Sequence, residues 1–155
     1  MTKILFVCHG NICRSPMAEF VMKHMVEEAG LGEDFYIASA ATSSEELGNP
    51  VYPGTRQRLA REGISVAGKF AVRIRAADYE KYDYLIGMDS RNVANMLRTF
   101  GGDPDGKVCR LLDYTDSPRD IADPWYTGDF DTTYDDVCEG CVALLGVIST
   151  HNDVH

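Results

Sequence analysis

The sequence predicts an α/β fold in which an open, four-stranded parallel sheet carries helices on both faces. Short apolar runs rich in β-branched and aromatic residues alternate along the chain with segments whose apolar residues recur at helical spacing. This alternation implies right-handed crossovers between parallel strands. The length of 155 residues is that of one domain. We therefore expect a single domain over residues 1–155, without linkers or internal repeats.

The first predicted unit is a strand, a loop and a helix. "KILFVC" (Lys3–Cys8) is almost wholly apolar, which is typical of a central strand buried on both faces. Ser15 and Pro16 favour a helix start, with a capping hydroxyl and a proline at the first helical position. Helical spacing then continues to Gly30, a residue suited to ending a helix.

The rest of the chain repeats this pattern. "DSPRDIADPWYTGD" (Asp116–Asp129) is too long and too rich in proline for a simple connection, and loops of that kind are often functional. The apolar patterns predict three further strands and three further helices. They are the strands "FYIASA", "YDYLIGMD" and "KVCRLLDY" and the helices Gly54–Glu62, Ser90–Phe100 and Phe130–Ser149.

Composition excludes several classes of function. A net charge of −9 argues against general binding to nucleic acid or to an anionic membrane, because both need a basic face. No apolar run approaches the roughly 20 residues of a membrane-spanning helix, and the start "MTKILFVCHG" lacks the features of a signal peptide. Five cysteines, an odd number, favour free thiols. We expect a cytoplasmic protein, with a monomer as the favoured state.

The segment "VCHGNICRSP" (Val7–Pro16) contains two cysteines, a glycine, an asparagine and an arginine. It lies at the carboxyl end of the first strand, where open parallel sheets bind ligands. Backbone N–H groups of a tight loop and a helix start form an anion cradle. Gly10 and Asn11 tolerate the dihedral angles that such a loop needs. Arg14 adds a planar fork for two phosphate oxygens, and its field stabilises a thiolate at Cys8. The segment predicts a nucleophile beneath a bound phosphate.

The motif "FVCHGNICRSPMAE" resembles the active-site loop of the low-molecular-weight protein tyrosine phosphatases. "SAATS" (Ser39–Ser43), "GNP" (Gly48–Pro50), "YDYLIGMD" and "DPWY" (Asp123–Tyr126) follow in the order and spacing of that family, over nearly the whole chain. The resemblance implies a flavodoxin-like or Rossmann-like fold with a phosphate loop after the first strand. It also implies hydrolysis of phosphotyrosine in proteins through a cysteinyl-phosphate, with no metal and no organic cofactor.

By this resemblance, Cys8 is the nucleophile, Arg14 the phosphate clamp and Asp123 the general acid. Ser15 supports the thiolate as a leaving group. The chemistry agrees independently, because phosphoryl transfer needs an in-line nucleophile and an acid for the leaving oxygen. Asp123–Pro124 taken alone is typical of a turn, but its place in a long loop beside aromatic residues favours the acid role. The residues expected to hold the shape of the loop are Asn11, Ser39 and Asp89.

The expected substrate pocket has two walls. Trp125 and Tyr126 either belong to the core or form one wall of a slot for an aromatic leaving group, and their position beside Asp123 favours the slot. Glu45 stands where many family members have an aromatic residue. Glu45 and Glu46 together favour basic residues next to the phosphosite, or a smaller substrate. His9 is expected at the rim, facing substrate, rather than acting as a base. The loop residues expected to bind substrate are His9, Gly10, Asn11, Ile12 and Cys13.

Rival functions use the same fold. Arsenate reductases need further cysteines on a segment after the third strand, and here that segment, "GMDSRNVANM", has none. A related branch hydrolyses phosphoarginine and carries threonine where this chain has Ile12, so the isoleucine favours tyrosine. A non-catalytic phosphate-binding module would keep Arg14 and could lose Cys8 or Asp123, yet both are present.

The remaining departures and cysteines leave alternatives open. A histidine that is usual before the third strand aligns with Lys69, which alters one buried support of the loop. Cys109 is expected in the core. "CEGC" (Cys138–Cys141) looks like a redox or metal pair, but its place within a helix favours core and surface positions. Cys13 either packs behind the loop or forms a protective disulfide with oxidised Cys8.

Overall fold

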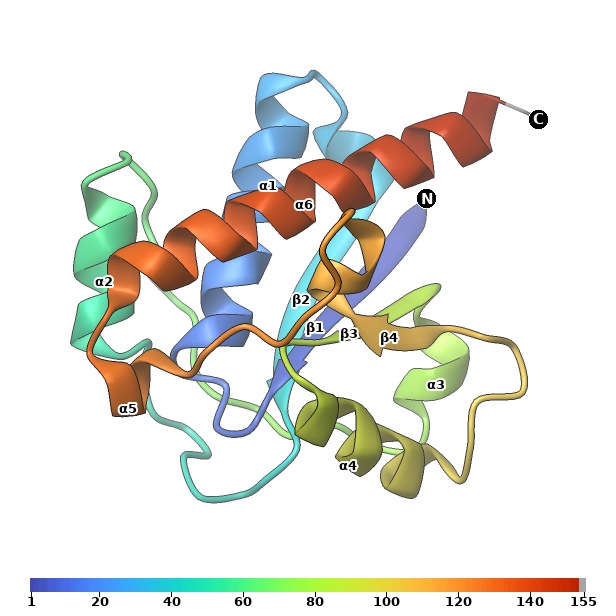
Figure 1. Ribbon diagram of the computed structural model, residues 1–155, viewed down its shortest axis with the longest axis horizontal. Coiled ribbons are helices and arrows are strands. Elements are labelled where there is room, and N and C mark those ends of the chain that lie inside the picture. The colour runs from blue at the N-terminus through green and yellow to red at the C-terminus, as the bar shows by residue number, and fades with distance from the viewer. Residues whose placement is uncertain (154–155) are drawn as a thin grey trace.

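The computed structural model describes residues 1–153, with side chains to residue 150, so residues 154 and 155 of the expected domain lie outside it. Its centre is a sheet of four parallel strands in the order β2-β1-β3-β4 (Figure 1). The predicted sheet is confirmed, and its order is flavodoxin-like. The strands are β1 (Thr2–Cys8), β2 (Phe35–Ala41), β3 (Tyr84–Gly87) and β4 (Val108–Arg110).

β1 lies in the middle of the sheet because its side chains are apolar on both faces. Ile4 and Phe6 belong to the core that includes residues of α1 and α6, whereas Leu5 and Val7 belong to the core that includes residues of α3 and α4. Helices therefore cover both faces (Figure 1). The helices are α1 (Arg14–Glu28), η1 (Gly32–Asp34), α2 (Pro53–Ala60), α3 (Asp78–Lys81), α4 (Ser90–Phe100), η2 (Leu111–Tyr114), α5 (Pro124–Thr127) and α6 (Phe130–Asp153).

Most helix boundaries agree with the sequence patterns. α4 has the predicted bounds because Asp89 and Asn92 form a capping box at its start, and Gly101 ends it in a left-handed conformation (φ 76°). α6 buries residues at helical spacing, including Val137, Cys141 and Leu144, and runs beyond the predicted end at Ser149. No helix within the described range is both long and apolar enough to span a membrane.

The start of α1 differs from the prediction. The helix begins at Arg14, and Cys13 precedes it without a capping side chain. Ser15 is therefore inside the first turn, and its hydroxyl lies 3.0 Å from the Cys8 sulfur. The predicted capping role of Ser15 is wrong because its hydroxyl contacts the Cys8 sulfur in the loop instead of capping the helix.

The strand predicted over "KVCRLLDY" is also too long. Only Val108–Arg110 pairs with β3, and the chain then turns into the 3-10 helix η2. The turn forms because the Asp113 carboxylate accepts hydrogen bonds from the backbone N–H and Nε of Arg110, each at 2.9 Å. Leu111 and Leu112 are buried as a result and belong to the same core as residues of α6. The short helices α3 and α5 were not predicted.

Candidate active site

The loop between β1 and α1 closes tightly around one unusual residue. Asn11 has φ +60°, and it is the one non-glycine residue with positive φ in the described part of the chain. Its side chain holds this conformation: Nδ2 donates to Ser15 Oγ at 2.8 Å and to Ser39 Oγ at 2.9 Å, and Oδ1 accepts from Val72 N at 3.1 Å. The amide thus ties the loop to β2 and to the segment after Lys69.

The sulfur of Cys8 lies at the bottom of this loop and is surrounded by donors. Cys8 is 3% exposed. Its Sγ accepts hydrogen bonds from the backbone N–H groups of Asn11 at 3.3 Å and Ser15 at 3.5 Å, and Ser15 Oγ lies 3.0 Å away. Such donors stabilise a negatively charged sulfur, the form in which cysteine is a nucleophile.

Arg14 reaches the same site from the first turn of α1. Its buried guanidinium donates from Nη1 to Asp89 Oδ2 at 2.7 Å and to the carbonyl of Ile121 at 2.8 Å, and Nη2 lies 3.6 Å from Asp123 Oδ2. Burial lowers the pKa of Arg14, but negative charge at Cys8, Asp89 and Asp123 raises it overall. Asp89, at the start of α4, therefore fixes the orientation of a permanent cation beside the sulfur.

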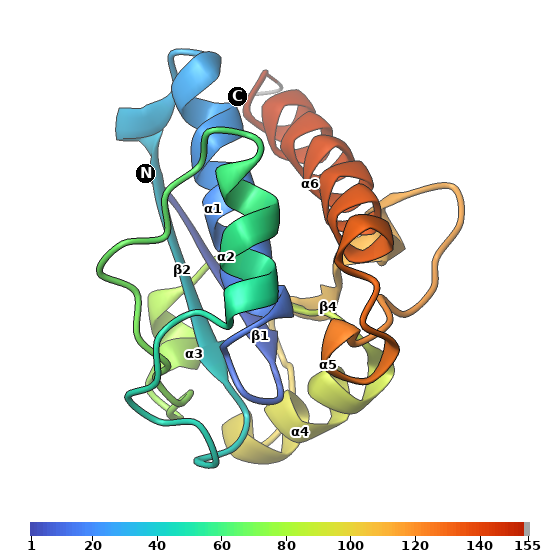
Figure 2. The same ribbon diagram turned by 90° about the vertical axis from the view of Figure 1, so that its left-hand side faces the viewer.

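Asp123 comes to the site from the long segment before α5. Its side chain caps this helix by accepting from Trp125 N at 3.1 Å. Figure 2 shows α5 at the same end of the sheet as the loop after β1 and the start of α4. Trp125 is 53% exposed and Tyr126 is 84% exposed, so the alternative that they are core residues is wrong.

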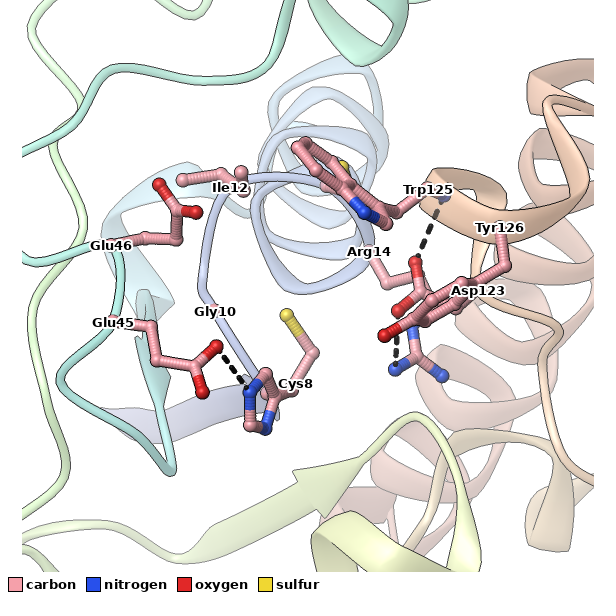
Figure 3. A pocket seen from close by; sticks show the side chains of 11 residues that line it. Cys8, Gly10, Ile12, Arg14, Glu45, Glu46, Asp123, Trp125 and Tyr126 are labelled. Carbon is pink, nitrogen blue, oxygen red and sulfur yellow. Dashed lines mark hydrogen bonds and ion pairs between the residues drawn. The ribbon is translucent and has the colours of Figure 1, made fainter.

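These groups surround a cavity of about 140 Å³ (Figure 3). Figure 3 shows Cys8 and Arg14 facing the opening, with Asp123, Trp125 and Tyr126 on one side and Glu45 and Glu46 on the other. The residues that line it are Cys8, His9, Gly10, Ile12, Cys13, Arg14, Glu45, Glu46, Asp123, Trp125 and Tyr126.

Asn11, expected to bind substrate, does not line this cavity. It is 1% exposed, and its amide is engaged behind the loop by Ser15, Ser39 and Val72. Ser15, Ser39 and Asp89 also lie outside the lining and hold the loop or Arg14. Glu46, predicted together with Glu45 to favour basic residues next to the phosphosite, also lines the cavity.

A histidine and a carboxylate form a pair at the rim. His9 Nε2 and Glu45 Oε2 are 2.9 Å apart, with side-chain exposures of 49% and 70% (Figure 3). The hydroxyl of Ser43 donates to the carbonyl of His9 at 2.9 Å and so joins the loop after β2 to the loop after β1. The wall opposite Trp125 is acidic rather than aromatic.

A buried ion pair supports the loop from behind. Glu19, in α1, is 4% exposed and accepts a hydrogen bond from Ser39 Oγ. Lys69 Nζ donates to the Ser39 carbonyl at 2.8 Å and lies 3.7 Å from Glu19, and burial lowers the pKa of Lys69. Glu19 was missed because its spacing to Lys23 is that of an ordinary surface pair on a helix.

The cysteines outside the loop lie apart from the cavity. Cys141 is fully buried in α6 and Cys138 is partly buried, as the core-and-surface interpretation expects. Cys109 is partly buried and donates to Tyr114 Oη at 3.1 Å. All five cysteines are free thiols.

Residues 3–153 match the family model described as low molecular weight phosphotyrosine protein phosphatase. The chain belongs to this phosphatase family. It is 38% identical over 150 residues to the low molecular weight protein-tyrosine-phosphatase YfkJ of Bacillus subtilis, covering 96% of both chains. It is 34% identical over 149 residues to PtpA of Staphylococcus aureus, covering 96% of this chain and 94% of that one.

Solved structures of family members have the same fold. The crystal structure of YfkJ superposes with a TM-score of 0.93 and covers 97% of this chain and 96% of that chain. The structure of DARP, a drosophila arginine phosphatase, has a TM-score of 0.84 at 30% identity and covers 96% of this chain and 98% of its own. The family assignment and the fold agree with the resemblance seen in the sequence.

Proposed function

We propose that this phosphatase hydrolyses phosphotyrosine in proteins through a cysteinyl-phosphate, with Cys8 as the nucleophile and Asp123 as the general acid. The observation that carries this assignment is the convergence of the two side chains on one cavity, with Arg14 beside both. A thiol, a guanidinium and a carboxylic acid on one small cavity are the parts that transfer of a phosphoryl group to sulfur requires.

The first step transfers the phosphoryl group to the enzyme. The Cys8 thiolate attacks phosphorus, the bond from phosphorus to the tyrosine oxygen breaks, and Asp123 gives that oxygen its proton. Arg14 and the N–H groups of the loop stabilise the charge on the other phosphate oxygens. The N–H donors around Cys8 Sγ stabilise the negative charge of the attacking thiolate.

The second step releases phosphate. Water attacks phosphorus, the S–P bond breaks, and the Asp123 carboxylate takes the proton that the water loses. Ser15 Oγ, 3.0 Å from the sulfur, stabilises the departing thiolate. Both steps use groups of this chain alone, which supports a monomer as the working unit and residues 1–155 as one domain. The free thiols suit a reducing compartment such as the cytoplasm.

The shape of the cavity indicates the substrate. Ile12, Trp125 and Tyr126 offer apolar and aromatic surface for a phenyl ring. Glu45 and Glu46 form an acidic wall, so we propose that phosphotyrosine flanked by lysine or arginine is preferred.

The same acidic wall supports phosphoarginine as a second candidate substrate. Its guanidinium leaving group is a cation, which the carboxylates of Glu45 and Glu46 would attract. Ile12 argues for the aromatic substrate, because an isoleucine side chain offers a ring apolar contact and offers a guanidinium no hydrogen bond.

The test is an assay of purified protein on phosphotyrosine, phosphoserine and phosphoarginine peptides. Turnover of phosphotyrosine alone is expected. Cys8→Ser should lower kcat by more than about 10³-fold while inorganic phosphate still binds. Asp123→Asn should slow substrates with poor leaving groups far more than those with good ones. Faster turnover of phosphoarginine, or an active Cys8→Ala variant, would refute the proposal.

A further inference from the structure

The segment that leads to Asp123 carries two consecutive charged residues that contact different parts of the fold. Arg119 Nη2 donates to Asp136 Oδ1 at 2.9 Å and to Glu139 Oε1 at 3.1 Å, both on α6. Asp120 contacts the start of α4 instead, at Ser90. The segment is therefore held from two sides before it reaches α5 (Figure 1).

Asp120 is the centre of a small polar cluster. Its Oδ1 accepts from the N–H and from the hydroxyl of Ser90, each at 2.9 Å, and from Arg110 Nη1 at 3.0 Å. Arg110 is itself fixed by Asp113, whose Oδ1 lies 2.9 Å from Nε and 2.8 Å from Nη2. Partial burial raises the pKa of Asp120, but the bonds from Arg110 and Ser90 lower it below its ordinary value. Asp120 is thus an anion at neutral pH.

The residue after Asp120 connects this cluster to the site. Ile121 is 1% exposed, its N–H donates to the carbonyl of Met88 at 2.9 Å, and its carbonyl accepts from Arg14 Nη1 at 2.8 Å. Asp123 follows two residues later and approaches Arg14 Nη2 to 3.6 Å. Successive residues of the segment are thus tied to the end of β3, the start of α4 and Arg14.

We propose that Asp120, held by Arg110 and Ser90, is a positioning residue that sets where the Asp123 carboxyl lies relative to Arg14 and the leaving oxygen. This inference rests on the proposed role of Asp123 as the general acid. Asp120 does not line the cavity, so it acts through the backbone of residues 121–123. Ser90, which donates to Asp120, directly follows Asp89 in the chain, and Asp89 orients Arg14.

Proton transfer is the step that depends most on this placement. A general acid must come within roughly 2.6–3.2 Å of the atom it protonates. A shift of about 1 Å can cost up to about 10²-fold in rate. The cost falls on substrates whose leaving group needs the proton, because a good leaving group departs as an anion.

The experiment measures kcat/KM of full-length variants on aryl phosphates whose phenols differ in acidity. Asp120→Ala should lose about tenfold on phenyl phosphate and less than about threefold on dinitrophenyl phosphate. Asp120→Asn keeps an oxygen for the donors of Ser90 and should lose less. Arg110→Gln removes the cation and should reproduce the pattern of Asp120→Ala. Asp116→Asn, which removes an exposed carboxylate from the same segment, should match the unmodified protein.

A second arm separates this inference from the proposed function. The kcat/KM of Asp123→Asn alone should fall steeply as the leaving group becomes poorer. If it does not, the proposed general acid is wrong. In the Asp123→Asn background, Asp120→Ala should cost less than about twofold, because no acid is left to position. A uniform loss on all substrates, or a full loss in that background, would overturn the positioning role. If Asp120→Ala does not fold, Asp120→Asn and Arg110→Gln decide the question.

Discussion

The phosphate loop (residues 8–14) and the acid segment (residues 115–123) supply the two halves of one site, but they are held in different ways. In the phosphate loop, Cys8 and Asn11 are buried, and four of their contacts lie within the loop and the first turn of α1. In the acid segment, the anchors are charged, more exposed and distant in sequence. The immediate surroundings of the nucleophile are thus mostly local in sequence, whereas the acid is placed by charged contacts between distant parts of the chain.

This difference predicts where substitutions act. A change in the phosphate loop should weaken every step, because the same hydrogen bonds shape the nucleophile and the phosphate cradle. A change at the charged anchors of the acid segment, Arg119 and Asp120, should weaken mainly proton transfer, because these side chains do not line the cavity. Each variant below tests one side of this comparison.

Among the variants that test this comparison, the largest effect is expected at Asn11. Asn11→Ala removes three side-chain hydrogen bonds and places an alanine at φ +60°. We expect kcat/KM to fall about 10²-fold on good and poor leaving groups alike. The free energy of unfolding should fall by about 1–3 kcal/mol, because buried partners lose their bonds. Kinetics on two aryl phosphates measure the change in kcat/KM, and urea unfolding measures the change in the free energy of unfolding.

Asn11→Gly is the matched control, since glycine tolerates positive φ and also lacks the amide. It should recover part of the stability lost in Asn11→Ala but little of the activity. An effect confined to poor leaving groups would contradict the view that the loop serves every step.

The next effect concerns oxidation of the phosphate loop, from which Cys13 is expected to protect Cys8. Cys8 and Cys13 line the same cavity, and burial together with the charge of Cys8 raises the pKa of Cys13 to about 12. Peroxide should oxidise the Cys8 sulfur to a sulfenic acid. The Cys13 thiol can then form the S–S bond with loss of water, which protects Cys8 from irreversible oxidation.

A mass loss of two hydrogens and full recovery with a dithiol are therefore expected after mild peroxide. Cys13→Ser should recover about tenfold less activity and carry added oxygens on Cys8. Equal recovery of the two proteins would mean that Cys13 only packs behind the loop.

The same comparison explains which parts of the site can be predicted from the sequence. Gly10, Asn11 and Arg14 adjoin Cys8 in the chain, so residue type and position after a strand suffice to predict the nucleophile loop. The partners of the acid segment are not local: the contact of Asp120 with Ser90 exists only once β3 and β4 have paired. The strand predicted over "KVCRLLDY" is too long for a different, local reason, since Asp113 turns the chain after Arg110 by accepting from the Arg110 N–H.

A smaller effect is expected at the acidic wall. Glu45→Gln should reduce the preference for phosphotyrosine peptides with neighbouring lysine or arginine about fivefold, because a carboxylate that attracts them is lost. High salt should reduce the preference of the unmodified protein in the same direction. Glu33→Gln, an exposed site near the other end of β2, is the control. Equal kcat/KM on acidic and basic peptides before mutation would exclude the acidic wall as a determinant.

The smallest expected effect is a difference in Tm that depends on pH for the charged anchor Asp120 but not for the uncharged anchor Asn11. The folded protein holds Asp120 with a pKa below the ordinary value of about 3.9, so its stabilising contribution is present above about pH 4 and is lost as the pH falls through the folded pKa. Asp120→Asn should therefore lower Tm by about 1–3 °C at pH 7 and by progressively less as the pH falls through the folded pKa. The Tm difference of Asn11→Ala should stay constant over that range, because an amide does not titrate. Thermal unfolding of the unmodified protein, Asp120→Asn and Asn11→Ala from pH 7 to pH 2 measures both differences. If the Tm difference for Asp120→Asn is equal at pH 7 and pH 2, the charge of Asp120 does not stabilise the fold.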